Sequence, residues 1–202
     1  MMSQFIPPLA AMIATAVIAG YGDFVVAAWG LGSRLEFFSI IIVLALTMAM
    51  PPIIGKLRGS HDLEKIHHVV KIAVGFVIVW QLIVAVILMS ISTPLSNLLT
   101  SDHTVANTLN EYLWIVPLSY GALGICMIMV SVCSAIGMPN LALLISVLRL
   151  FGCYLPLLWI GSVLADLNGL FIGAMLGNFV AGFLSWHIYM HNFKKLKSKY
   201  SS

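Results

Sequence analysis

The sequence predicts an all-α fold, a polytopic membrane helix bundle of about six transmembrane helices. Of its 202 residues, 61% are hydrophobic and only 8% are charged. Soluble domains are roughly 25% charged, so this chain has too few charged side chains to cover a surface that faces water. Long apolar runs recur along the chain, and most of its lysines and arginines gather in two short stretches between or after those runs. Both features are typical of a protein that crosses a bilayer several times.

Six apolar runs are close to the length that a membrane-crossing helix needs, which is about 20 residues. The predicted spans are residues 4–20, 24–50, 66–92, 109–136, 141–164 and 167–190. The first is the shortest, and it opens with Pro7-Pro8, which the first turn of a helix tolerates. Residues 1–192 are therefore predicted to form one six-helix membrane domain, and residues 193–202 a basic tail.

The basic residues predict the orientation of the spans. Eight of the ten lysines and arginines fall in two groups, at residues 56–71 and at residues 194–199. The loops after the first, third and fifth spans carry acids and no lysine or arginine. The positive-inside rule then places both termini in the cytoplasm. The charge pattern supports the last five spans, and only length supports the first.

Prolines and glycines interrupt the predicted spans. Pro117 and Pro156 lie inside apolar runs, where a proline kinks a helix. The last span carries Gly169, Gly173 and Gly177, four residues apart, so that they share one helix face and let another backbone approach closely. We expect this face to serve helix packing, and contact with a substrate is the alternative interpretation.

Charged residues also lie deep inside the spans. Arg34 and Glu36 are two residues apart in the second span, so their side chains diverge on a helix and cannot pair locally. A charge at bilayer depth costs at least about 2.5 kcal/mol, so each needs a partner on another helix or a polar cavity. Arg149 in the fifth span is the natural candidate partner for Glu36, and Gln81 and Asn178 add neutral polarity. Either a buried Arg–Glu pair fixes the packing, or Glu36 carries a proton or a cation.

The sequence lacks the motifs of common enzymes. Cys126, Cys133 and Cys153 stand singly in apolar runs, and neither H-E-x-x-H, G-x-S-x-G nor a G-x-x-x-x-G-K-[ST] loop occurs. Glu36 is the one carboxylate deep in a predicted span, so paired acids for hydrolysis within the membrane are missing. We therefore expect no enzymatic activity, no metal site, no cofactor and no nucleic-acid partner.

Three runs of the chain follow one another in a recognisable order: YGDFVVAAWGLGSRLE, MPPIIGKLRGSHDLEK and SVCSAIGMPNLALLISVLRLFGCYLPLLW. Together they resemble the second half of multidrug and toxic compound extrusion (MATE) transporters. The first two are similar to a helix and cytoplasmic turn of that family, and the third to its later helices, where a G.p turn precedes an R......P pattern. The resemblance covers nearly the whole chain.

The resemblance implies the carboxy-terminal six-helix lobe of a twelve-helix antiporter in a bacterial inner membrane. In such a protein, sodium or proton entry drives the export of cationic, amphipathic small molecules. A second six-helix lobe would then be its partner.

The chain departs from the family pattern at two acidic positions. Some members carry an acid in the first helix of this lobe, and residues 4–20 contain none. Some carry an aspartate early in the fourth helix, about where Tyr120 stands here. We therefore expect ion coupling at Glu36 or in the missing lobe. The residues expected to line or brace the cavity are Arg34, Tyr120, Arg149 and Asn178.

Two other interpretations are compatible with the sequence. The chain could be a non-transporting membrane protein, either a truncated product or a scaffold that packs against another bundle. It could also be a half-size carrier that forms a homodimer, because a two-fold axis along the membrane normal would rebuild twelve helices from two copies.

Overall fold

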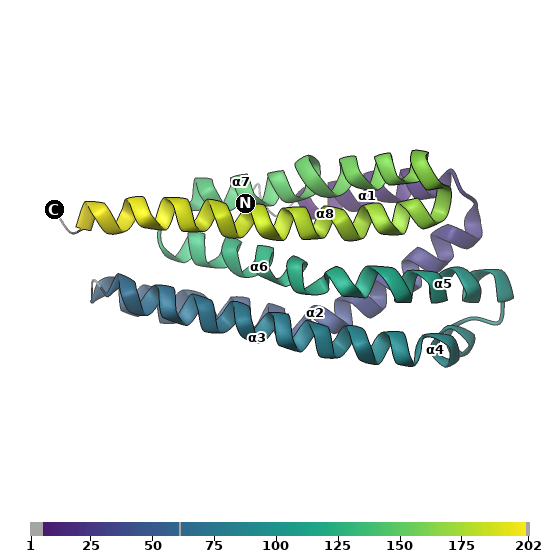
Figure 1. Ribbon diagram of the computed structural model, residues 1–202, viewed down its shortest axis with the longest axis horizontal. Coiled ribbons are helices and arrows are strands. Elements are labelled where there is room, and N and C mark those ends of the chain that lie inside the picture. The colour runs from purple at the N-terminus through teal and green to yellow at the C-terminus, as the bar shows by residue number, and fades with distance from the viewer. Residues whose placement is uncertain (1–5, 61, 201–202) are drawn as a thin grey trace.

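A computed structural model describes residues 6–60 and 62–200, and the side chains of residues 11–60 and 62–193. The described chain is an all-α bundle without strands, so the predicted fold class is confirmed (Figure 1). Its α-helices are α1 (Ile6–Ala19), α2 (Asp23–Gly59), α3 (Leu63–Ser90), α4 (Ser92–Leu99), α5 (His103–Ile115), α6 (Tyr120–Ala135), α7 (Pro139–Val147) and α8 (Leu155–Tyr200). A 3₁₀ turn, η2 (Val116–Ser119), joins α5 to α6, and a π-helix, η3 (Leu148–Tyr154), joins α7 to α8.

Helix α8 consists of two antiparallel arms. Its helical backbone is broken at Ala165 and Asp166, and Asp166 has a φ of 47°, a value that residues other than glycine seldom adopt. The chain reverses there, so the arms before and after Asp166 lie side by side (Figure 1). The described chain therefore passes through the bundle six times: in α1, α2, α3, α5–α6, α7 with the first arm of α8, and the second arm of α8.

Four helical stretches are long and apolar enough to cross a membrane by length and composition, at Asp23–Gly59, Leu63–Ser90, His103–Ala135 and Pro139–Phe193. The last one contains the reversal at Asp166 and so holds two passes. The described part of helix α1 has 14 residues. The beginning of the first predicted span lies outside the described residues. Helix α8 continues to Tyr200, so the predicted tail at 193–202 begins as helix.

Helix α2 continues beyond residue 50, where the predicted span ends. Pro51 and Pro52 lie inside the helix, which ends only at Gly59. Pro51 has no N–H to donate to the carbonyl of Thr47, four residues earlier, but the hydroxyl of Ser131 on α6 donates to that carbonyl at 2.7 Å. A neighbouring helix thus satisfies the group that the proline frees, which is how prolines persist within membrane helices.

The two predicted interruptions lie at or near changes of helix type. Pro117 lies in the 3₁₀ turn η2, and Pro156 is the second residue after the π-helix η3. Local 3₁₀ and π geometry lets the carbonyls that a proline leaves without a partner find other donors. The short helix α4 has no counterpart among the predicted spans.

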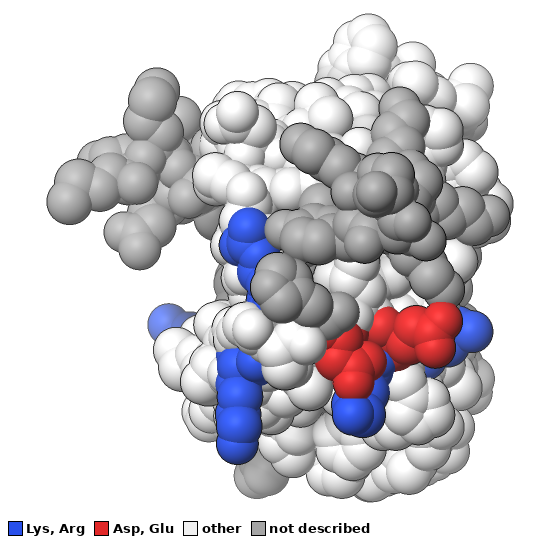
Figure 2. Space-filling view, turned by 90° about the vertical axis from the view of Figure 1, so that its left-hand side faces the viewer, with Lys and Arg blue, Asp and Glu red and all other residues white. Residues whose placement is uncertain are grey.

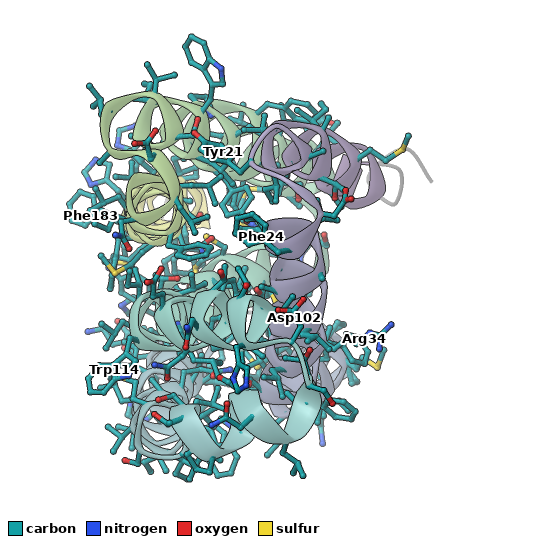
Figure 3. The ribbon with its side chains drawn as sticks, turned by 90° about the vertical axis from the view of Figure 1, so that its right-hand side faces the viewer. Tyr21, Phe24, Arg34, Asp102, Trp114 and Phe183 are labelled. Atoms are coloured by element: carbon teal, nitrogen blue, oxygen red, sulfur yellow. The ribbon has the colours of Figure 1, made fainter. Side chains whose placement is uncertain are left out.

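The bundle has a basic end and an acidic end. The basic end lies at the turn between α2 and α3, and Figure 2 shows lysine and arginine side chains gathered there beside acidic ones. At this turn Asp62 caps α3 and forms a 2.6 Å ion pair with Lys65. The acidic end, seen in Figure 3, holds the turn between α1 and α2, helix α4 and the reversal at Asp166.

Buried side chains form two main clusters along the bundle. The cluster toward the basic end, the basic-end core, joins α2, α3, α6 and α7 through residues such as Val43, Met50, Ile54, Ile66, Val77 and Met129. The cluster toward the acidic end, the acidic-end core, is built on α1, α2, α5 and α8 and contains Leu109, Tyr112, Tyr120, Leu158 and Phe171. All three cysteines are buried and free.

The glycine face of the last span lies at a contact between helices. A Cβ atom on Gly173 would meet the backbone of Leu157, so the two arms of α8 approach as closely as two backbones can. A Cβ on Gly169 would likewise meet the backbone of Gly161, and one on Gly177 would meet that of Tyr154. The structure thus places the three glycines within the packing of this lobe.

Candidate functional site

A cavity of about 440 Å³ opens between α1, α2, η3 and the second arm of α8. This volume is in the range of small-molecule sites. Most of its wall is apolar, and its polar side chains are Thr15, Ser33, Glu36, Arg149, Tyr154 and Asn178. Helix α1 forms one wall and is tied to the bundle at its end, where the hydroxyl of Tyr21 donates to the carbonyl of Ser162 at 2.6 Å.

Glu36 reaches the cavity from α2 and is half-buried. The hydroxyl of Tyr112 on α5 donates to its Oε2 at 3.3 Å. Tyr112 itself is buried, with the ring of Phe171 edge-on to it at 5.6 Å. A Cβ atom on Gly32 would collide with the Tyr112 ring, so the glycine one turn before Glu36 lets the tyrosine lie against α2. Helix α2 therefore carries Glu36 and, at Gly32, leaves the space that the Tyr112 ring occupies.

Arg149 reaches the same cavity from the π-helix η3. A π-helix closes its hydrogen bonds over five residues instead of four, so side chains five apart come to one face. Arg149 and Tyr154 are five apart, and both line the cavity. The Nε of Arg149 is buried and finds no acceptor among the residues that the structure describes. No ion pair joins Arg149 to Glu36 in the described part of the chain, so the two side chains share the cavity without direct pairing.

Two neutral polar residues of the sequence prediction have defined partners. Asn178 is buried, lines the cavity, and donates from Nδ2 to the Ser119 hydroxyl of η2 at 3.0 Å. Gln81 is buried between α3 and α2, where its amide donates to the carbonyl of Ser39 at 3.2 Å. Asn178 therefore belongs to the cavity, and Gln81 joins two helices outside its wall.

Tyr120 and Arg34 lie apart from the cavity wall. Tyr120 is fully buried in the acidic-end core, and its hydroxyl makes no hydrogen bond within the described part of the chain. Arg34 is exposed and points outward from α2 (Figure 3). It borders a separate shallow pocket next to Leu99 and Thr100. The structure therefore joins Glu36, Arg149 and Asn178 in one site and leaves Arg34 on another surface.

Sequence reasoning missed Tyr112 and Tyr154. Tyr112 stands near the start of a predicted span and carries no motif, so its bond to Glu36 depends on how α5 packs against α2. On an α-helix, side chains five residues apart point in different directions, so the spacing from Arg149 to Tyr154 predicts no shared site. Only the π geometry places both in the cavity. Pro156, which follows η3, was the available signal for irregular helix geometry at this point.

The fold and the site define a multi-pass membrane protein with a mainly apolar cavity that contains a few polar side chains, the architecture of a membrane transporter. The MatE family model matches residues 1–160, and the chain belongs to that family.

Known relatives are longer than this chain. It is 29% identical over 185 residues to a FAD transporter of Shewanella oneidensis, covering 92% of this chain and 41% of that protein. It is 48% identical to the MATE transporter VcmN of Vibrio cholerae, whose crystal structure in the bent form matches with a TM-score of 0.94 over 96% of this chain and 44% of that one. The chain thus spans less than half the length of both.

More distant structures share the fold. The outward-facing and inward-facing conformations of a multidrug resistance MATE family transporter match with TM-scores of 0.92 and 0.90, each at 20% identity. They cover 98% and 97% of this chain, and 45% and 46% of theirs. The fold of the whole lobe is therefore found in structures of both conformations.

Proposed function

We propose that this chain is the carboxy-terminal lobe of a secondary antiporter, which exports amphipathic small molecules across a bacterial inner membrane in exchange for sodium or protons. The observation that carries the proposal is the cavity, where Glu36 meets an apolar wall inside a MatE-family lobe. The basic end would face the cytoplasm, as would both termini. The chain would catalyse no reaction and would need no cofactor.

Glu36 would be the coupling site. Its carboxylate lies in the cavity and accepts a hydrogen bond from Tyr112, which leaves its other oxygen able to bind a proton or a sodium ion. The same charge would attract the cationic group of an amphipathic substrate, while the apolar wall would take the rest of that molecule. Binding of the ion and of the substrate would then compete at one carboxylate, which is the requirement for exchange.

A second six-helix lobe would close the cavity. The chain spans less than half of its relatives, and helix α1 and the first half of α2 present the cavity on one side of the lobe. Alternating access would follow if this lobe moved as a unit against the other, and the match to both outward-facing and inward-facing structures supports such a movement.

The experiment is energy-dependent ethidium efflux from efflux-deficient bacteria, with membrane insertion measured on the same cells. The chain would be expressed alone, and also with any in-frame coding sequence that precedes it in its gene. We expect efflux from the longer product. Efflux from the chain alone would favour a homodimeric carrier, and no efflux from either well-inserted product would favour a non-transporting scaffold.

The first variant for that assay is Glu36→Gln, which removes the charge and keeps the shape. We expect efflux to fall at least tenfold, because the coupling ion loses its ligand. The matched control is Glu111→Gln, the same change at an exposed position on α5 outside the cavity. If Glu36→Gln exports as well as the parent protein, Glu36 is not the coupling site.

A further inference from the structure

We propose that Arg149 recognises an anionic group, so that the ligand of the cavity is an amphipathic molecule carrying a carboxylate or a phosphate. The inference rests on the proposed function, because it names the chemistry of the ligand at that same site. A cationic group elsewhere on the molecule would face Glu36.

The first observation is a buried hydrogen-bond donor of Arg149 that has no acceptor within the described part of the chain. Arg149 lines the cavity, and its Nε is buried without an acceptor among the described residues. A buried donor without a partner is costly, and more so when it is charged. Glu36 would be the obvious acceptor, but no ion pair between the two occurs in the described chain. The guanidinium group is therefore positioned for an acceptor that enters the cavity.

The second observation is the backbone that carries Arg149. The π-helix η3 brings Arg149 and Tyr154 to one face, and both line the cavity. Helices of this type are rare and occur frequently at functional sites. A regular α-helix would turn one of these side chains away. The π-helix therefore brings the guanidinium group of Arg149 and the phenol group of Tyr154 to the same cavity.

The third observation is the chemical fit between the group and its surroundings. A guanidinium group offers a planar set of donors that matches the two oxygens of a carboxylate or phosphate. Glu36, the nearby negative group, already accepts a hydrogen bond from Tyr112. An anion would still be repelled by its charge. The structure therefore predicts opposite effects on anion binding when Arg149 and Glu36 are each neutralised.

The test is binding of two probes with the same ring system, 2-naphthoate and the neutral 2-naphthamide. The full chain is purified in an uncharged detergent, and binding is measured by equilibrium dialysis against empty micelles. We expect 2-naphthoate to bind about tenfold more tightly than the amide, as a charge-assisted contact allows. Arg149→Gln should abolish this preference. Lys71→Gln, which removes a positive charge from an exposed site outside the cavity, should keep it.

Two further variants make the test independent of whether Arg149→Gln folds. Arg149→Lys keeps the charge but loses the planar donors, so the preference should fall several-fold. Glu36→Gln should tighten 2-naphthoate binding and leave the amide unchanged. Equal or undetectable binding of the two probes by the parent chain would overturn the proposal, as would a preference that survives in folded Arg149→Gln.

The efflux assay separates this inference from the proposed function. A preference for 2-naphthoate that depends on Arg149, without efflux from any form of the protein, would support anion recognition and contradict transport. Efflux of ethidium by a protein that binds the two probes equally would support transport and contradict anion recognition.

Discussion

The two cores of the bundle differ in what lies beside them. The basic-end core is mainly aliphatic, with Tyr189 and Phe193 of α8 among residues of α2, α3, α6 and α7. The acidic-end core includes Tyr112 and Tyr120, and the cavity with Glu36 opens beside it. Side chains that fill space completely give a stiff unit, whereas a cavity requires missing contacts and exposed polar atoms. The comparison indicates that one half of the lobe holds its shape and the other half carries the site.

Helix α2 belongs to both halves and shows the change most directly. Its first half faces the cavity with Gly30, Ser33 and Glu36, and its second half fills the basic-end core with Met50 and Ile54. Polar residues thus line the cavity in the first half of the helix, beside large apolar ones such as Trp29 and Phe37, whereas its buried residues in the second half are apolar. Substitutions on α2 can therefore test whether the two halves differ in stability as well as in composition.

The largest expected effect comes from the same truncation in both halves. Ile54→Ala should lower the free energy of unfolding by about 2 kcal/mol or more, because Ile54 is fully buried and its loss leaves a void. Ile40→Ala, on the same helix but half-buried at the cavity, should cost about 1 kcal/mol or less. Both values come from unfolding in mixed micelles with a denaturing detergent. Equal costs would show that the cavity side is as tightly packed as the core.

A smaller effect is expected where two backbones meet. Gly173→Ala should destabilise the protein by about 1–3 kcal/mol, because the new methyl group would meet the backbone of Leu157. Gly75→Ala on α3 is the control, since a Cβ there has open space and alanine favours a helix. Thermal unfolding of the two variants should shift in opposite directions. Similar shifts would exclude close packing of the α8 arms as the reason for the glycine.

The smallest effect concerns the turn at the basic end. The hydrogen bond from the Lys65 ammonium group, and then the one from its backbone N–H, hold the pKa of Asp62 below its ordinary value of 3.8. A lowered pKa in the folded state stabilises the protein above the ordinary pKa, and this contribution is lost as the pH falls through the folded-state value.

Asp62→Ala should therefore lower the thermal midpoint slightly at pH 6, and the difference from the parent protein should shrink as the pH falls below about 4. Asp62→Asn keeps a capping side chain and should lose less than Asp62→Ala. The measurement is a series of thermal unfolding curves for the three proteins between pH 6 and pH 3. A difference between parent and Asp62→Ala that stays constant over this range would contradict the assigned role of the ion pair.

Much of the fold could be predicted from composition and spacing. A chain with so few charges must hide its backbone in helices when it enters a bilayer, and the apolar runs gave the positions of the passes. Interruptions of the helices at Pro117 and Pro156 were also predicted, since a missing N–H acts locally, but the 3₁₀ and π geometry found there was not. Glu36 and Arg149 were predicted as candidate site residues, because a charged side chain inside an apolar run needs a partner or a polar cavity.

Only the tertiary structure decided which of those charges share a cavity. Arg34 and Arg149 look alike in the sequence, yet one is exposed and the other reaches Glu36's cavity through a π-helix. Helix α2 passes Pro51 because Ser131, distant in sequence, donates to the freed carbonyl. A sequence pattern shows how long an apolar helix is and where it lacks a hydrogen-bond donor. Which side chains satisfy the free carbonyls and the buried charges depends on contacts between helices, and these form only when the bundle packs.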